Sequence, residues 1–158
     1  MTGDVILCFV QSTPEEEAFM KFYEVSQTID GTPDEVWQVL SDGPAFVSWD
    51  SGIVNFEGDI ALGNKVKLFS EVSPERAFPL KVDVMDRPNK LIFKGGMPLG
   101  LFKGVRTYTL SPEGAGTKFH MREEFSGPLL NMIWKSMPDL QPSFEKFANG
   151  LKTKVERR

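Results

Sequence analysis

The sequence has very few of the side chains that bind metals or form disulfides. Its 158 residues include one cysteine, Cys8, and one histidine, His120. A lone cysteine excludes an internal disulfide and fits a reducing cytosol, so we expect a cytoplasmic protein. One cysteine and one histidine are too few for a typical zinc site, and we expect neither a metal nor a cofactor.

Long apolar runs and an excess of basic residues are also missing. No segment is long enough to span a bilayer, so we expect no stable membrane insertion. The formal net charge is -4 at pH 7. This balance argues against a nucleic-acid partner, because binding a phosphate backbone requires concentrated Lys and Arg.

The length favours one main domain. We assign residues 20–158 to this domain and residues 1–19 to an N-terminal extension, either a tail or an added edge strand. The extension holds a short apolar run, Val5–Val10, and then an acidic stretch. No basic region precedes the run, which argues against a signal peptide.

The main domain begins with a strand followed by a capped helix. Phe22–Ile29 alternates between two faces, as a strand does. Thr32 is a good N-cap, Pro33 suits the first helical position, and Glu35 is the third residue after the cap. The glycine and proline of residues 41–44 predict the end of this helix.

The middle of the chain predicts an antiparallel meander. Its strand-like segments are separated by short turns rich in Gly, Pro and Asn. These connections are too short for crossover helices, so neighbouring strands pair antiparallel. The expected strands are Ile53–Glu57, Lys65–Ser70, Phe78–Asp86, Lys90–Lys94, Leu101–Leu110 and Thr117–Ser126.

A long amphipathic helix closes the domain. Its apolar residues form one stripe, and Pro138 and Pro142 restrict its start to near or after residue 140. The whole order predicts an α+β fold in which a curved antiparallel sheet wraps around this helix and encloses a cavity. The stripe consists of Leu140, Phe144, Phe147, Leu151 and Val155.

A set of residues spread along this order of segments carries a resemblance to a known superfamily. The residues are Ile29–Trp37, Trp49, Glu57, Gly58, Gly63, Pro88–Leu91, Gly116, Thr117, Glu123–Gly127, Leu151 and Lys152. Over about residues 20–156 the chain is similar to the START-related polyketide cyclase/dehydrase and lipid-transport (SRPBCC) superfamily. The resemblance implies a helix-grip fold with a deep hydrophobic cavity between the sheet and the C-terminal helix. It says more about the fold than about the function.

Glu123 is the most informative polar residue. It alternates with Phe119, Met121 and Phe125, so we expect it to point inward. A buried carboxylate must pair, protonate or bind something.

A hairpin between the last two strands would bring Arg106 near Glu123. With Leu110 opposite Thr117, Arg106 lies diagonally from Glu123. Two interpretations remain open: an internal ion pair, or a ligand anchor that could also serve as a general acid or base. His120 shares a strand face with Arg122 and Glu124. This indicates that His120 faces solvent and argues against a catalytic role.

Apolar side chains supply the remaining candidate ligand contacts. Trp49 either closes the core or stacks on a ligand. Leu129–Met137 is apolar almost all round, so it is either packed in the core or a mobile lid. The tip Gly95–Phe102 lacks a phosphate-loop signature and is either a packed hairpin end or a gate. The other expected contacts are Tyr108, Phe93, Phe119, Met121, Val82 and Trp134.

Three functions fit this pattern. The first, which we favour, is a carrier or sensor that binds a hydrophobic or aromatic small molecule, lipid- or polyketide-like, in an internal cavity. The second is a polyketide cyclase/dehydratase-like enzyme. The third is a protein-interaction module of the chaperone-activator type. Ionisable residues are sparse at the expected inward positions, which favours binding over catalysis.

Overall fold

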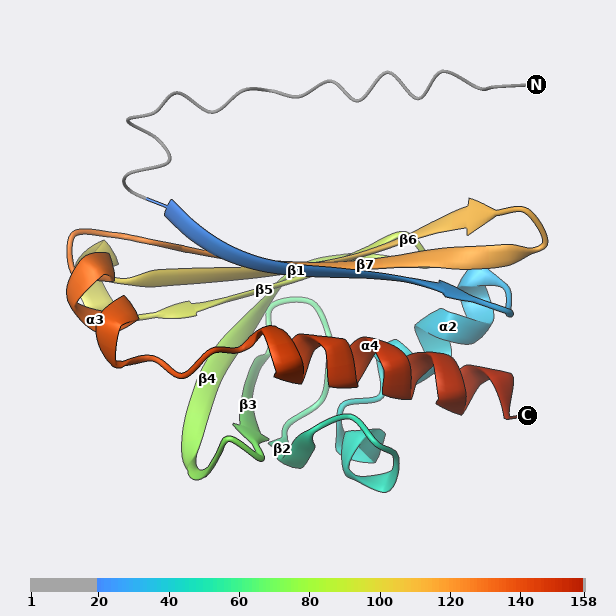
Figure 1. Ribbon diagram of the computed structural model, residues 1–158, viewed down its shortest axis with the longest axis horizontal. Coiled ribbons are helices and arrows are strands. Elements are labelled where there is room, and N and C mark those ends of the chain that lie inside the picture. Colours follow the sequence, from blue (N-terminus) through green and yellow to red (C-terminus); the bar gives the residue numbers. More distant parts are fainter. Residues whose placement is uncertain (1–19, 158) are drawn as a thin grey trace, which may run out of the picture.

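One curved sheet of seven antiparallel strands forms the frame of the protein (Figure 1). The structure is a computed structural model that describes residues 20–157. The strand order is β1-β7-β6-β5-β4-β3-β2, so β2 to β7 form the predicted meander and β1 pairs with β7. The N-terminal extension assigned to residues 1–19 lies outside the described residues. The strands are β1 (Met20–Ile29), β2 (Ile53–Glu57), β3 (Lys65–Ser70), β4 (Ser73–Asp86), β5 (Lys90–Gly96), β6 (Lys103–Glu113) and β7 (Gly116–Ser126).

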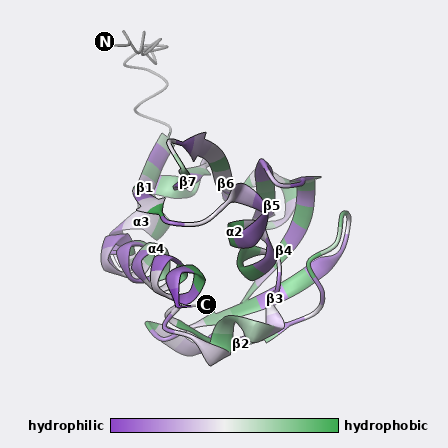
Figure 2. Ribbon diagram, turned by 90° about the vertical axis from the view of Figure 1, so that its right-hand side faces the viewer, coloured by the Kyte–Doolittle hydropathy of each residue, from purple (hydrophilic) through white to green (hydrophobic). Residues whose placement is uncertain are grey.

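The sheet wraps around the long C-terminal helix α4 (Gln141–Glu156), as predicted for a helix-grip α+β fold. Figure 2 shows the curve from β1, above α4, through β5 to β2, below it. Shorter helical segments fill the remaining space. They are α2 (Pro33–Leu40), η1 (Pro44–Ser48), η2 (Pro98–Gly100) and α3 (Leu130–Ser136).

The predicted apolar stripe of α4 faces the sheet. Phe144, Phe147, Leu151 and Val155 are all buried, and Leu140 packs beside them at the N-terminal end of the helix. The stripe is therefore confirmed as the part of α4 that anchors it to the core.

Helix α4 also covers the outer edge of β1. The Gln141 side chain donates to the carbonyl of Glu24 at 3.0 Å, and the Lys152 ammonium donates to the carbonyl of Thr28 at 2.9 Å. Backbone carbonyls at an open sheet edge are a template for unwanted pairing, so these contacts protect the edge as well as fixing the helix.

The sequence signals at α2 are confirmed. Thr32 accepts a hydrogen bond from the Glu35 N–H at 3.2 Å, and the Glu35 carboxylate accepts from the Thr32 N–H at 3.3 Å. This reciprocal capping box, with Pro33 in the first turn, fixes where the helix begins.

The β6–β7 hairpin has a different register from the one expected. Leu110 pairs with Phe119, whereas the sequence analysis placed it opposite Thr117. The reason is the turn: it has only two residues, with Gly114 at a φ of 59°, so both strands continue further than predicted.

This change of register brings the two charged candidates closer together. A shift of two residues keeps each side chain on the expected face of the sheet. Arg106 now lies directly opposite Glu123, rather than on a diagonal from it.

An aromatic cluster fills one half of the space between the sheet and α4. The Phe147 ring contacts the rings of Tyr108, Phe119, Phe46 and Trp49, with centroid distances from 5.3 to 6.3 Å. Because this half is closed by side chains, the open space lies toward the other end, beside α3 and the first turns of α4.

Candidate functional site

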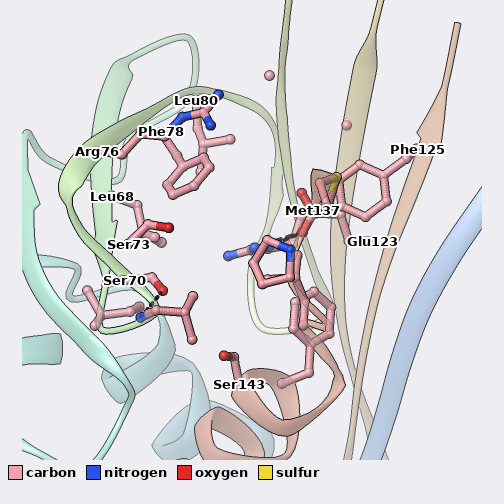
Figure 3. Close-up of a pocket in the computed structure, with 18 of the residues that line it drawn as sticks. Leu68, Ser70, Ser73, Arg76, Phe78, Leu80, Glu123, Phe125, Met137 and Ser143 are labelled. Atoms are coloured by element: carbon pink, nitrogen blue, oxygen red, sulfur yellow. Dashed lines mark hydrogen bonds and ion pairs between the residues drawn. The ribbon is translucent and has the colours of Figure 1, made fainter. Parts of the chain in front are cut away.

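A cavity of about 320 Å³ lies between the sheet and the N-terminal half of α4. Figure 3 shows its two walls: β3 and β4 on one side, and β6 and β7 on the other. Helix α3 contributes Ile133 and the residues that follow it contribute Met137. Pockets of this size commonly hold small molecules by apolar contact with a few polar groups.

Arg106 and Glu123 form the charged feature of this cavity. Both Nε and Nη2 of Arg106 donate to Oε2 of Glu123, at 3.1 and 2.7 Å. Their side chains are only 14% and 8% exposed. Such a pair is strongly coupled, because losing one partner would leave the other buried and charged.

The electrostatics keep Arg106 charged. Burial by itself lowers the pKa of the guanidinium, but Glu123 and then Tyr108 raise it above its ordinary value. Burial raises the pKa of the Tyr108 phenol, and Arg106 opposes part of that rise. At neutral pH Arg106 is therefore a cation at the cavity wall, and the phenol of Tyr108 beside it in the core is neutral.

Phe144 and Gly104 lie beside the ion pair. The guanidinium lies over the Phe144 ring of α4, 5.3 Å from its centroid. A Cβ at Gly104 would stand only 3.3 Å from Oε1 of Glu123. The absence of a side chain at Gly104 therefore leaves space beside the second carboxylate oxygen.

The structure brings only some of the predicted site residues to the cavity. Arg106, Glu123 and Met121 line it. The other predicted contacts do not, and three of them, Tyr108, Phe119 and Trp49, belong to the aromatic cluster around Phe147. These other residues are Val82, Phe93, Tyr108 and Phe119, which are buried in the core, and Trp49 and Trp134, which are partly buried.

The two tryptophans that were predicted as ligand contacts pack on other aromatic rings. Trp49 contacts Phe46 at 5.7 Å, and its indole Nε1 is buried without a hydrogen-bond partner among residues 20–157. Trp134 stacks on Tyr23 at 5.2 Å and contacts Phe125.

Helix α3 and the tip before β6 are joined to each other. The Leu129 N–H donates to the Leu101 carbonyl at 3.0 Å, and Phe102 stacks on Phe125 at 5.8 Å. Met132 of α3 is 63% exposed and Leu99 of the tip is 97% exposed. The segment Leu129–Met137 thus lies partly in the core and partly against solvent, at the edge of the cavity.

The wall formed by β3 and β4 was missed by the sequence analysis. It contributes Leu68, Ser73, Arg76, Phe78 and Leu80. The expected strand began at Phe78, whereas β4 begins at Ser73. The alternation of Arg76, Phe78 and Leu80 was the available signal, and Pro74 and Pro79 obscured it.

The single histidine lies away from the cavity. His120 lies on the outer face of the sheet, with a ring nitrogen 3.1 Å from Oε2 of Glu24. Within residues 20–157, no group of three or more His, Cys, Asp or Glu is arranged to hold a metal ion. In the same part of the chain, no helix combines the length and apolar character needed to cross a membrane.

Comparison with known families and structures agrees with this architecture. The sequence model of the family described as polyketide cyclase / dehydrase and lipid transport matches residues 20–156. No curated protein matches the chain in sequence.

Several solved structures share the fold. The Zhui aromatase/cyclase from Streptomyces sp. R1128 has a TM-score of 0.69 and 15% identity, over 88% of this chain and 95% of that chain. The di-domain aromatase/cyclase StfQ of the steffimycin biosynthetic pathway has a TM-score of 0.68 and 11% identity, over 91% and 54%. The protein Ara h 8.0201 has a TM-score of 0.64 and 17% identity, over 88% and 99%. At these identities the likeness is one of fold.

Proposed function

Because the chain belongs to the polyketide cyclase/dehydrase and lipid-transport family, we propose that it binds a hydrophobic or aromatic small molecule in its cavity, as a carrier or sensor. The observation that carries this proposal is the cavity itself, about 320 Å³ with a largely apolar wall and one buried ion pair. An apolar body gains free energy by leaving water, and the ion pair can orient a carbonyl or hydroxyl.

A polyketide cyclase/dehydratase-like activity is the second candidate. It is supported by the position of Glu123 and Arg106, whose charged groups reach the cavity wall. A carboxylate oxygen beside a fixed guanidinium can accept a proton from an acidic carbon while the cation stabilises an enolate oxygen. Turnover of a poly-β-ketone that is lost in Glu123→Gln, with binding retained, would select this function over simple carriage.

Binding is tested with a neutral apolar dye, N-phenyl-1-naphthylamine, whose fluorescence rises in apolar surroundings. We expect saturable binding at micromolar concentrations. Leu80 points into the cavity (Figure 3), so Leu80→Trp should fill space there and weaken binding by about tenfold or more. Leu62 is 66% exposed and lies outside the cavity wall, so Leu62→Trp is the matched control and should bind as the parent does.

Two outcomes would contradict the proposal. One is the lack of any saturable signal from the parent protein. The other is equal loss of binding in both tryptophan variants, which would place the dye on the surface. Denaturation curves of both variants establish that each is folded at the temperature of the assay.

A further inference from the structure

The cavity reaches the surface through an apolar rim. Val72, Phe78 and Met97 line the cavity, and their exposed fractions are 44%, 37% and 43%. These three residues are called the mouth. Leu99, two residues beyond Met97, is 97% exposed and has a φ of 61°, which is uncommon for a residue other than glycine. Apolar side chains gathered at the rim of a cavity are typical of a surface that another segment or molecule covers.

One apolar segment of this chain is available to cover the mouth. It is the run Val5–Val10 of the N-terminal extension, in which all six residues are apolar. Such a run gains free energy by leaving water for an apolar surface. Addition of the run as a strand beside β1 is disfavoured, because side chains of α4 already bond the carbonyls of Glu24 and Thr28 on that edge.

The extension joins the domain at the end of the sheet where the mouth lies. Met20 pairs with Ser126, Ser126 with Lys103, and Lys103 with Gly96, which precedes Met97. Figure 1 shows the start of β1 at the same end of the sheet as α3. Three strand spacings amount to about 14 Å, whereas the ten residues from Val10 to Met20 can span about 33 Å. The run can therefore reach the mouth.

The charge of the extension complements lysines on the way to the mouth. The extension has no Lys or Arg, and its four acidic residues account for the whole formal net charge of -4. Its last acidic residues, 15–17, stay within about 17 Å of Met20 along the chain. Lys103 lies two strands from Met20, which is about 10 Å. Within residues 20–157, neither Lys103 nor Lys135 of α3 makes an ion pair.

We propose that Val5–Val10 docks on the mouth of the cavity in its own chain, with the acidic residues 15–17 beside Lys103 and Lys135. The extension then controls entry to the cavity. A ligand must displace the run, so its apparent affinity falls in proportion to the fraction of molecules whose mouth is uncovered. This inference goes beyond the proposed function, because it concerns what covers the cavity and not what the cavity binds.

A spin label tests where the run lies. In the full chain, Cys8→Ser removes the only cysteine, and Gln11→Cys then carries a nitroxide directly after the run. We expect strong paramagnetic broadening of the methyl groups of Val72 and Met97, relative to the same protein with the label reduced. The methyl groups of Leu110, at the opposite end of β6, should be unaffected and show that the domain is folded.

Two pairs of substitutions test what holds the run. Leu7→Ser with Phe9→Ser should abolish the broadening, and Lys103→Gln with Lys135→Gln should reduce it. Lys118→Gln is the matched control for the charge and should leave the broadening intact, because Lys118 is an exposed cation near the other end of β7. In the unlabelled protein the two serines should tighten dye binding about threefold or more, since a mouth that is covered two-thirds of the time weakens apparent affinity threefold.

Three results would overturn the inference. The first is broadening that is absent from the mouth or that survives the two serines. The second is dye affinity that the two serines leave unchanged. The third is broadening of methyl-labelled protein by a spin-labelled protein that carries no methyl label, since the run would then bind a second copy. Loss of dye binding in every variant would contradict the proposed function instead, while the spin label still decides where the run lies.

Discussion

Replacing Phe147 with alanine should lower the free energy of unfolding by about 3–5 kcal/mol, because it leaves a void in the aromatic cluster. The side chain is 3% exposed, and four neighbouring rings contact it. The neighbours come from η1, the following loop and two strands, so they cannot all move inward to fill the space. Chemical denaturation measures the change directly.

Phe22→Ala is the control for this substitution. The Phe22 ring is 46% exposed and lies under the Arg122 guanidinium on the outer face of the sheet. The same change of side chain should cost only about 1 kcal/mol there. Similar small losses at both positions would show that α4 does not pack on the sheet through Phe147.

Replacing Glu123 with leucine should destabilise the protein by about 3–5 kcal/mol, because it leaves the Arg106 guanidinium buried without its partner. Adding Arg106→Met to the same chain should recover much of this loss, since a pair of apolar residues needs no charged partner. The double variant is therefore expected to be more stable than Glu123→Leu alone.

A double-mutant cycle separates this coupling from unrelated effects. The partly exposed pair Arg122 and Glu124, with nitrogen and oxygen 2.9 Å apart, is the control, and its coupling should stay below about 1 kcal/mol. If the effects at Arg106 and Glu123 add to within about 0.5 kcal/mol, the buried pair is not coupled as described.

The fold was predictable because its signals are local. Alternation identified the strands, the cap at Thr32 identified a helix start, and the stripe through Phe147 identified the buried face of α4. The register of the β6–β7 hairpin was not predictable in this way, because it depends on whether the Gly-containing turn has two residues or more. The expected and observed registers of this hairpin differ by two positions.

The candidate site was only partly predictable, because it also depends on how distant parts of the chain pack. Strand alternation placed Arg106, Met121 and Glu123 on the inner face of the sheet, and all three line the cavity. Which inward residues meet open space depends on where Phe147 fills the interior, and that is a matter of tertiary packing. The β3–β4 wall depends on how far the sheet curls, which periodicity does not encode.

Methyl NMR of the protein titrated with N-phenyl-1-naphthylamine tests the central claim, that the cavity is the binding site. Methyl groups of Leu80, Met121 and Ile133 line the cavity, whereas those of Val36 are buried elsewhere and those of Leu62 are on the surface. Saturable shifts at the three cavity residues, with Val36 and Leu62 unchanged, are the predicted result. Saturable shifts centred on Leu62, or no saturable shift at any cavity methyl, would contradict it.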